Sequence, residues 1–487
     1  MDLAGRVRDL AGARVLVVGD IMLDLYVSGS ANRISPEAPI PILKAEHTYS
    51  MLGGAGNVVR NLAALGAMPS FVGVAAEDPE GTEIRALLAE SAGDAHFRLL
   101  VETGRPTTRK IRYLAGAHQL LRVDRELSAP LSQETSAALL AAVEDAMAGV
   151  GVLVLSDYAK GVLTPPTVAS LIEAARRAGC RVIVDPKALD FSVYRGAGLI
   201  TPNRRELAAA SGMAASSDAE IERACRELLA ACDIGAVLVT RSEEGMSLVT
   251  REGETHHLPA RAREVFDVSG AGDTVVAVLS AALAAGEDLP GAAHLANLAA
   301  GIVVGKVGTA VVRPDELLHA VHEEDWMEAE TKIVSLESVL EHARAWRRAG
   351  LRVGFTNGCF DLIHPGHVSL LRQARGACDR LIVGLNSDAS VKRLKGDGRP
   401  VQPESARAVV LASLMGIDRV VIFSADTPLD LIEAIRPEVL VKGADYSRAA
   451  VVGGDIVERH GGRVLLADLV PGHSTSATIR RLGTRAG

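Results

Sequence analysis

Two short stretches of the sequence combine residue types that suit chemistry on phosphate groups. In the first, residues 267–274 (DVSGAGDT), small residues lead into an apolar helical run. Backbone N–H groups at a helix start carry partial positive charge and bind phosphate, and glycines let that backbone approach a ligand closely. Asp273, in the first helical turn, is placed to take a proton from a hydroxyl that attacks a terminal phosphoryl group. An ordinary helix start, in which Asp273 complements the helix dipole, is the alternative.

The second stretch is residues 364–367 (HPGH), between a predicted strand at 352–357 and a predicted helix at 368–376. Proline is favoured in the first turn of a helix, and glycine leaves room above it. Both imidazoles can therefore meet phosphates at the helix start and stabilise charge on a reacting α-phosphate and a departing pyrophosphate. Zinc fits less well, because helical zinc pairs more often use a four-residue spacing and no third ligand follows nearby. Two surface histidines are the remaining alternative.

The elements around the first stretch repeat a pattern of buried strand, polar loop and helix. Predicted strands lie at 14–20, 152–156, 181–185, 199–201 and 236–240. Strands that alternate with helices predict a parallel sheet, which binds ligands at the carboxyl ends of its strands. The polar residues that we expect at this edge are Asp20, Asp24, Asp157, Asp185, Lys187, Asn203, Glu206 and Arg241. A strand at 263–266 is expected to lead into the glycine turn.

Further candidates lie before residue 125. A glycine turn at 53–57 (GGAGN) opens a helix, where Asn57 either hydrogen-bonds a sugar or caps the helix. Residues 30–42 contain prolines among apolar residues and predict an extended edge segment or a lid. Lys110 lies in a short alternating segment, 108–112, which is predicted to be a strand.

The motifs GGAGN (53–57), DPK (185–187), TPNRRE (201–206) and DVSGAGD (267–273) resemble the ribokinase family of sugar kinases, over roughly residues 10–318. The resemblance implies an α/β fold, a ribokinase-like parallel-sheet sandwich with a small β lid, and Asp273 as the catalytic base. The ATP- and phosphate-binding residues would be Asn203, Arg204, Arg205, Glu206, Ser269, Gly270, Ala271 and Gly272. The sugar-binding residues would be Asp20, Asp24, Arg33, Gly53, Gly54, Asn57, Lys110, Asp185 and Lys187. No direct side-chain metal cluster is expected; Mg²⁺ would enter with ATP, near Asn203 and Glu206, and K⁺ is a candidate second cation.

The last part of the chain predicts a second small α/β domain. A strand at 381–386 precedes Lys392, Lys395 and Arg399, which we place in one loop. A single such cation is most often solvated, whereas three beside a phosphate site suit a triphosphate clamp. The hydroxyls at 474–476 either cap the last helix or bind phosphate.

The HPGH motif, together with STSATIR at 474–480, resembles the nucleotidyltransferase superfamily of cytidylyltransferases and adenylyltransferases, over roughly residues 350–482. The resemblance implies a Rossmann-like HxGH domain in which His364, His367 and Lys442 are catalytic. The nucleotide-binding residues would be Thr356, Asn357, Gly358, Phe360, Asn386, Asp388, Lys392, Arg399, Ser474, Thr475 and Ser476.

The order of kinase domain (1–320), linker (321–335) and transferase domain (336–487) resembles the bacterial family that joins D-glycero-β-D-manno-heptose 7-phosphate kinase to heptose 1-phosphate adenylyltransferase. The resemblance implies phosphorylation at O1, then adenylyl transfer from ATP to give ADP-heptose for lipopolysaccharide. A separate phosphatase is implied, because the chain shows no phosphatase motif. Another sugar phosphate, or CTP in place of ATP, is the alternative, and a non-catalytic scaffold is disfavoured by the intact catalytic residues. Family precedent also implies a homodimer, through edge strands at 33–45 and 105–125.

Composition limits the other classes of function. The 487-residue chain carries a net charge of −8, which gives no support to nucleic-acid or anionic-membrane binding. The five cysteines are scattered without metal spacing, and their odd number argues against a disulfide framework. Residues 1–20 lack a signal-peptide pattern, and no apolar run reaches the length of a membrane span. We therefore expect a cytoplasmic enzyme with small-molecule substrates.

Overall fold

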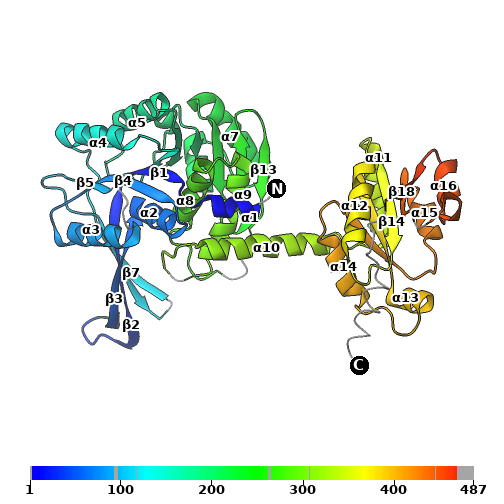
Figure 1. Ribbon diagram of the computed structural model, residues 1–487. Helices are drawn as coiled ribbons and strands as arrows, with labels where there is room; N and C mark the ends of the chain where they lie inside the picture. The colour runs from blue at the N-terminus through cyan, green and yellow to red at the C-terminus, as the bar shows by residue number, and fades with distance from the viewer. Residues whose placement is uncertain are drawn as a thin grey trace. The chain divides into compact units, whose positions relative to one another are not determined.

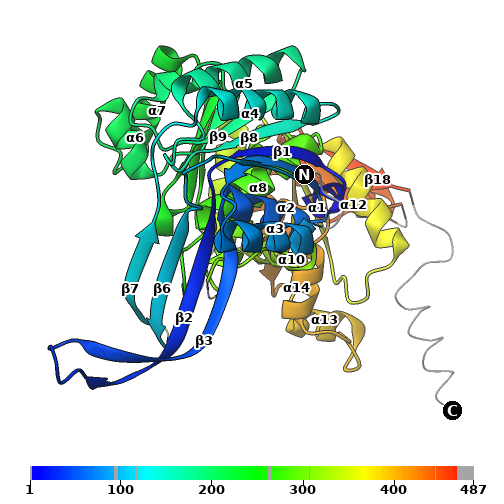
Figure 2. The same ribbon diagram turned by 90° about the vertical axis from the view of Figure 1, so that its left-hand side faces the viewer.

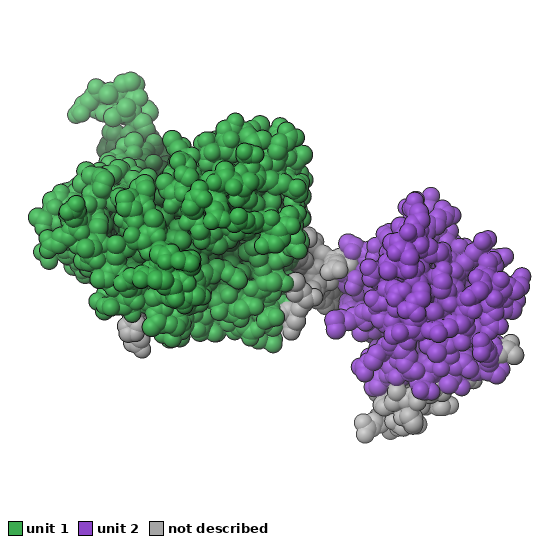
Figure 3. Space-filling view, turned by 90° about the horizontal axis from the view of Figure 1, so that it is seen from above, with its two compact units in different colours: residues 1–321 green, residues 322–487 purple. Residues whose placement is uncertain are grey.

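The computed structural model describes residues 3–92, 97–116, 118–260, 265–306, 308–444 and 446–468. The chain divides into two compact units, residues 1–321 and 322–487 (Figure 3). Each unit is built around its own sheet, and each is described by itself.

The central sheet of the first unit has the strand order β13-β12-β11-β10-β9-β8-β1-β4-β5. Its strands are β1 (Arg14–Gly19), β4 (Met68–Ala75), β5 (Phe97–Val101), β8 (Val152–Ser156), β9 (Arg181–Asp185), β10 (Leu199–Ile200), β11 (Ala236–Thr240), β12 (Met246–Thr250) and β13 (Thr255–Leu258). The pairs from β5 to β11 are parallel, and β12 and β13 extend the sheet in antiparallel fashion. The strands between the edge strands β5 and β13 are almost fully buried, as expected for a sheet covered on both faces. The predicted parallel sheet is confirmed.

Helices pack on both faces of this sheet (Figure 1). Together with the sheet they form two separate hydrophobic cores. One face carries α1 (Leu3–Asp9), α2 (Ala55–Ala64), α3 (Pro79–Ala92), α8 (Ala271–Ala284), α9 (Leu289–Val303) and the beginning of α10 (Pro314–Thr331). The other face carries α4 (Gln133–Ala146), α5 (Pro165–Arg177), α6 (Arg204–Ser211) and α7 (Asp218–Cys232), with short 3₁₀ turns at Phe191–Tyr194 and Ser242–Glu244. Residues 273–283 of α8 are buried all round, whereas Gly272, in the first turn, is exposed.

A second sheet, with the order β3-β2-β6-β7, projects from the first unit (Figure 2). Its strands are β2 (Ile21–Ile34), β3 (Pro41–Gly54), β6 (Arg109–Ala115) and β7 (His118–Arg125). β2 and β3 continue beyond β6 and β7 as a long hairpin (Figure 2), and the proline-rich stretch forms its tip. The sequence predicts an extended edge segment or a lid at residues 30–42, and these residues belong to β2, β3 and the turn between them.

The second unit has a parallel sheet in the order β16-β15-β14-β17-β18. Its strands are β14 (Val353–Gly358), β15 (Arg380–Asn386), β16 (Arg419–Phe423), β17 (Val439–Gly443) and β18 (Arg463–Ala467). Its helices are α11 (Leu336–Arg348), α12 (Pro365–Ala377), α13 (Asp388–Lys395), α14 (Glu404–Ala412), α15 (Leu429–Ile435) and α16 (Gly454–Arg459), with a 3₁₀ turn at Arg448–Ala450. Two core clusters cover the two sheet faces. The Rossmann-like architecture expected of this part is confirmed.

The structure corrects several local predictions. The helix expected at 314–322 continues as α10 to Thr331, because the acidic segment is rich in strong helix formers such as Glu, Ala and Met. Residues 265–266 form no strand; instead Phe266 N donates to the carbonyl of Val304. Ser474, Thr475 and Ser476 lie outside the described residues. Among the described helices, none is long and apolar enough to cross a membrane.

Candidate active sites

Asp273 lies in the first turn of α8, and its side chain is fixed from two directions. Its Oδ2 accepts a hydrogen bond from Asn57 Nδ2 at 2.8 Å, and its Oδ1 accepts one from the hydroxyl of Tyr158 at 2.6 Å. Burial raises the pKa of Asp273 to about 6, against the opposing hydrogen bonds from Tyr158 and Asn57. A carboxyl group with this pKa is ionised at neutral pH and still basic enough to accept a proton. The sequence predicts Asp273 and Asn57 at this site, and it misses Tyr158.

The turn before Asp273 leaves no room for a larger residue at Gly270. Gly270 has φ 79°, in the left-handed region, and a Cβ there would lie 2.7 Å from Asn57 Nδ2. The carboxylate of Asp267 holds the turn, accepting from Ser269 N at 2.8 Å and from Gly308 N at 3.1 Å. Residues 269–272 thus run into the N-terminus of a long helix, where an anion is favoured.

The second sheet, β3-β2-β6-β7, brings a buried ion pair to the region around Asp273. Arg112 Nη1 lies 2.7 Å from Asp24 Oδ1, and Asp24 is 4% exposed. Beside them, Lys110 Nζ stands 5.9 Å from the centre of the Tyr158 ring, and burial lowers the pKa of Lys110. A Cβ at Gly53 would lie 2.6 Å from Asp24 Oδ2. An assignment of Lys110 and Arg112 to opposite faces of this strand is wrong, because residues two apart share a face of β6; Arg112 is therefore a site residue that the sequence prediction does not include.

The structure gives Asp20 backbone partners and places Arg33 in the long hairpin, although both are predicted to bind the sugar. The Asp20 carboxylate is buried and accepts hydrogen bonds from the backbone N–H groups of Tyr158 (2.9 Å), Lys160 (3.0 Å) and Val162 (3.3 Å), so it orders the loop after β8. Arg33 lies nine residues beyond Asp24 along β2, on the order of 30 Å at strand rise. It is exposed in the long hairpin, so the structure does not bring it to the Asp273 site of its own chain.

The predicted phosphate motif forms a capping box at the start of α6. Asn203 Oδ1 accepts from Glu206 N, and Glu206 Oε2 accepts from Asn203 N, each at 3.0 Å. Glu206 Oε1 also binds Lys187 Nζ at 2.8 Å. Arg204 pairs with Glu244, and Arg205 is exposed.

At the end of β9, Asp185 lies near Thr201, whose hydroxyl is 3.4 Å from Asp185 Oδ1. Burial, with the charges of Asp273 and Glu206, raises the pKa of Asp185 well above its ordinary value. Within the described residues, no group of three or more His, Cys, Asp and Glu side chains could hold a metal ion.

The paired histidines of the second unit stack at the start of α12. His364 is the N-cap residue, Pro365 occupies the first turn, and the two imidazole centroids are 3.8 Å apart at 21°. Phe360 has φ 43° and its ring centroid lies 5.1 Å from that of His367. Burial and the neighbouring His364 lower the pKa of His367 to about 4. His367 is therefore neutral at physiological pH and can act on a phosphate as a hydrogen-bond donor.

The ends of β14, β15 and β17 converge beside these histidines. Lys442 Nζ donates to the carbonyl of Asn357 at 3.2 Å, which places the β17 lysine next to Thr356, Asn357 and Gly358. Asn386, at the end of β15, donates through Nδ2 to Ser390 Oγ at 3.1 Å. The structure thus groups these predicted residues at one edge of the sheet.

A buried arginine that the sequence does not single out links the loops of this edge. Arg407, on α14, is 1% exposed. It donates to the carbonyls of Cys359 (2.6 Å), Asn386 (2.9 Å) and Gln402 (3.0 Å), and to Asp388 Oδ1 (2.6 Å). One guanidinium therefore joins the loop before the histidines, the end of β15 and the loop before α14.

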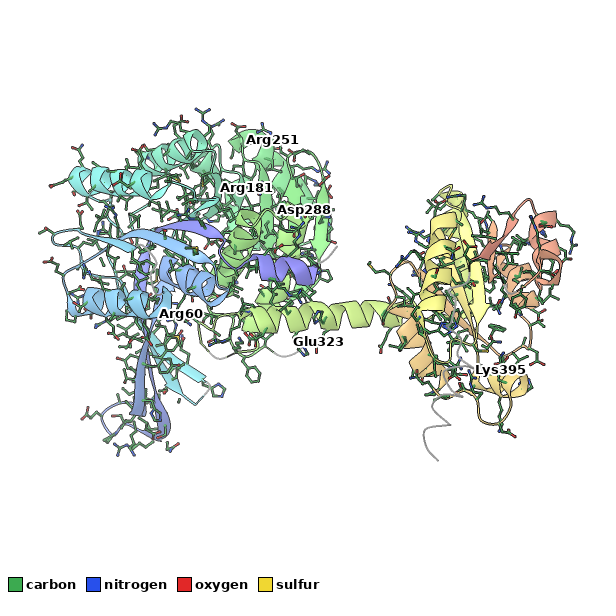
Figure 4. All side chains as sticks on the ribbon, viewed as in Figure 1. Arg60, Arg181, Arg251, Asp288, Glu323 and Lys395 are labelled. Atoms are coloured by element: carbon green, nitrogen blue, oxygen red, sulfur yellow. The ribbon has the colours of Figure 1, made fainter. Side chains whose placement is uncertain are left out.

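Of the three cations predicted to lie in one loop, two lie on a helix in the structure. Lys392 and Lys395 lie on α13, with Lys395 at its end (Figure 4), because Ser387 caps that helix through its hydroxyl. Lys392 Nζ lies 3.0 Å from the exposed Asp397. Arg399 is held by the buried Asp361, whose Oδ1 also accepts from the backbone of residues 401 and 402.

The folds and sites together define a carbohydrate kinase joined to a nucleotidyltransferase. Residues 13–316 match the pfkB family of carbohydrate kinases, and residues 355–476 match the cytidylyltransferase-like family. A structure of phosphofructokinase-2 from Escherichia coli in complex with potassium is similar in fold, with a TM-score of 0.56 at 21% identity over 64% of this chain and 99% of that one.

The chain belongs to the family of the bifunctional protein HldE. It is 57% identical to that protein from Paramagnetospirillum magneticum over 480 residues, 99% of this chain and 98% of the relative. It is 58% identical to that from Acidiphilium cryptum over 481 residues, 99% of this chain and 98% of the relative. Both matches extend over nearly the whole length of each chain, and so they include both units of this protein.

Proposed function

We propose that the first unit transfers a phosphoryl group from ATP to O1 of D-glycero-β-D-manno-heptose 7-phosphate, and that the second transfers an adenylyl group from ATP to heptose 1-phosphate. The observation that carries this proposal is the buried Asp273 at the start of α8, in a chain that also stacks two histidines at the start of α12. The reactions fit in sequence, because phosphorylation of an anomeric hydroxyl creates the phosphate that then attacks ATP.

In the kinase reaction, Asp273 takes the proton of the sugar hydroxyl as that oxygen forms a bond to the γ-phosphorus. The bond from the γ-phosphorus to the bridging oxygen of ADP breaks. The helix start at 270–272 favours the charge on the transferring group. Asp24, Lys110 and Arg112 hold the sugar, while Asp20 acts by ordering the loop that carries Tyr158.

Mg²⁺ bound with ATP would neutralise phosphate charge. The oxygens of Asn203 and Glu206 suit a hard cation, although each already accepts a hydrogen bond from the capping box. K⁺ remains a candidate second cation.

In the transferase reaction, an oxygen of the sugar 1-phosphate attacks the α-phosphorus of ATP, and the bond to pyrophosphate breaks without a covalent enzyme intermediate. His364, His367 and Lys442, with the N-terminus of α12, stabilise the charge that develops. Arg407 fixes the loops around them.

The remaining predictions concern a partner enzyme of the pathway, the location of the protein, its oligomeric state and the use of its product. A separate phosphatase would remove the 7-phosphate between the two steps, and the enzyme would work in the cytoplasm as a homodimer. The product would supply an activated heptose to lipopolysaccharide.

Mass spectrometry of products from heptose 7-phosphate and ATP, with and without an added phosphatase, tests the proposal. We expect heptose bisphosphate without the phosphatase and ADP-heptose with it. Turnover of CTP but not ATP in the second step would reject adenylyl transfer, and turnover of a different sugar phosphate alone would reject heptose.

A further inference from the structure

The hydroxyl of Tyr158 is the second fixed donor on the Asp273 carboxylate. It donates to Oδ1 at 2.6 Å, while Asn57 donates to Oδ2 at 2.8 Å. The two donors come from different elements, since Asn57 lies on α2 and Tyr158 in the loop after β8. One donor on each oxygen prevents the carboxylate from turning about its Cβ–Cγ bond.

The loop that carries Tyr158 is itself held in place. Asp20 accepts from the backbone N–H of Tyr158 at 2.9 Å and from that of Lys160 at 3.0 Å. Ala159 takes φ 53°, unusual for a residue with a Cβ, and its N–H donates to Asp157 Oδ1 at 2.8 Å. A strained backbone conformation persists only where the surrounding structure fixes it. The contacts of this loop therefore hold Tyr158 against Asp273.

We propose that Tyr158 is a positioning residue of the kinase site, whose hydroxyl orients the Asp273 carboxylate so that a free lone pair faces the attacking sugar hydroxyl. The inference deepens the proposed kinase function and rests on it. Each carboxylate oxygen has two lone pairs, so one remains on each after Tyr158 and Asn57 have donated. A general base needs this alignment, because it must lie within hydrogen-bond reach of the proton it takes.

Tyr158 keeps its own proton throughout. Burial, with the negative charges of Asp273 and Asp185, raises the pKa of Tyr158 well above its ordinary value. The proton of the sugar hydroxyl therefore moves to Asp273 and not along a relay through the tyrosine. Hydrogen bonds from a neutral hydroxyl to a carboxylate are short and strong, so Tyr158 also favours the ionised form of the base.

The groups around Asp273 predict the direction in which loss of the Tyr158 hydroxyl would shift the pKa of Asp273. The other charged groups that face Asp273 are Asp24 on β2, Lys110 on β6, Arg60 on α2 (labelled in Figure 4) and Asp185 at the end of β9. Burial and Asp24 raise the pKa of Asp273, while Tyr158, Asn57 and Lys110 lower it. Removal of the Tyr158 hydroxyl takes away the first of the lowering contacts, so the pKa of Asp273 should rise above its value of about 6.

The test is the full-length Tyr158→Phe variant, assayed for both reactions across pH. We expect the kinase kcat to fall about ten-fold or more and the acid limb of its pH profile to move up by about one unit, since a hydrogen bond to a charged group has roughly that effect. The KM for ATP should not change, because Tyr158 contacts the base and not the nucleotide motif. Adenylyl transfer by the same preparation should be unaltered, which reports that the protein is intact.

Tyr194→Phe is the matched control. Tyr194 is also buried and donates its hydroxyl to a carboxylate, Asp157 Oδ2, at 2.6 Å, but it does not touch Asp273. It should leave the acid limb in place. An unmoved acid limb in Tyr158→Phe, or an equal shift in Tyr194→Phe, would overturn the inference. Failure of the unaltered chain to phosphorylate heptose 7-phosphate would instead count against the proposed function.

Discussion

Arg407 and Asp388 form an ion pair, with Nη2 of the arginine 2.6 Å from Oδ1 of the aspartate, in which the arginine side chain has no exposed surface. Its other donors reach backbone carbonyls of Cys359, Asn386 and Gln402. A planar guanidinium suits such a set of acceptors, whereas the point charge of lysine does not. The loop before the histidine pair, the end of β15 and the loop before α14 thus depend on one residue of α14.

Arg407→Lys should therefore damage adenylyl transfer while sparing the kinase. The variant keeps the charge but leaves buried carbonyls without donors, each at a cost of about 1–3 kcal/mol. We expect kcat/KM for adenylyl transfer to fall at least about ten-fold and the second unit to melt at a lower temperature, measured by calorimetry.

Arg393→Lys is the matched control, because Arg393 is on the exposed face of α13 and pairs there with Asp426. It should change both activities little, since exposed pairs contribute about 0–1 kcal/mol. Equal effects of the two variants would contradict the role given to Arg407.

Asp361→Asn should loosen the loop that carries Arg399. The Asp361 side chain is fully buried, and its oxygens accept from Arg399 and from the backbone of Val401 (2.7 Å) and Gln402 (3.1 Å). The amide that replaces the carboxylate would keep one oxygen as an acceptor but would turn its NH₂ group toward the other donors, so the partly buried Arg399 would lose its charged partner. We expect a higher KM for ATP in adenylyl transfer, read from initial rates.

Asp397→Asn serves as the control for that change, since Asp397 is almost fully exposed and pairs with Lys392 at the surface. Its kinetics should match those of the unaltered chain. An unchanged KM for ATP in Asp361→Asn would show that the loop does not help to bind the nucleotide.

Some of the sites follow from local sequence. Asp273, Gly270 and Asn57 are predicted because a glycine turn that opens a helix has a short-range signature. The paired histidines of residues 364–367 are predicted for the same reason. The buried strands and their polar ends follow from runs of apolar residues bounded by loops.

The site residues that the sequence does not predict share a physical cause: each acts through contacts with residues that are distant along the chain. Tyr158 lies 115 residues before Asp273, and Arg407 lies 48 residues after Cys359. No local pattern encodes such pairs. By contrast, the position of Lys392 on a helix has a local signal in the sequence, since Ser387 is a good N-cap residue. Arg33 shows a further limit of prediction from sequence. It is near Asp24 in the sequence, but an extended strand carries the two residues far apart in space.

Gly270→Ala should disable the kinase. The residue has φ 79°, and an added Cβ would lie 2.7 Å from Asn57 Nδ2, which donates to Asp273. The variant therefore combines backbone strain of about 1 kcal/mol or more with displacement of a group that holds the base. We expect the kinase kcat to fall about a hundred-fold, in line with a loss of geometry at the reacting atoms.

Gly286→Ala separates the two causes. Gly286 follows α8 at φ 90°, and an added Cβ there meets no atom within 4 Å. It should lower stability through backbone strain but leave the kinase kcat intact. Loss of activity in both variants would mean that strain alone, and not contact with Asn57, explains the effect.

The kinase and the transferase should respond differently to pH. Because burial raises the pKa of Asp273 to about 6, kinase kcat/KM should fall as the pH decreases through about 6, where the carboxylate becomes protonated and cannot accept the sugar proton. His367 has a pKa lowered to about 4, so its ring stays neutral in the same range and gives the transferase no acid limb near 6. Rates from about pH 5 to 8.5 measure both profiles on one preparation.

The same assignment predicts opposite phenotypes for two variants of the full chain. Asp273→Asn removes the base and should lower phosphorylation at least about a thousand-fold, with adenylyl transfer retained. His364→Ala removes one of the stacked imidazoles and should do the reverse. Since the chemistry of each reaction is confined to one unit, a folded variant that lost both activities would contradict the two-site arrangement. A kinase acid limb that persisted near 6 in the residual activity of Asp273→Asn would show that another group titrates there, and Asp185, whose pKa burial also raises, would be the next residue to change.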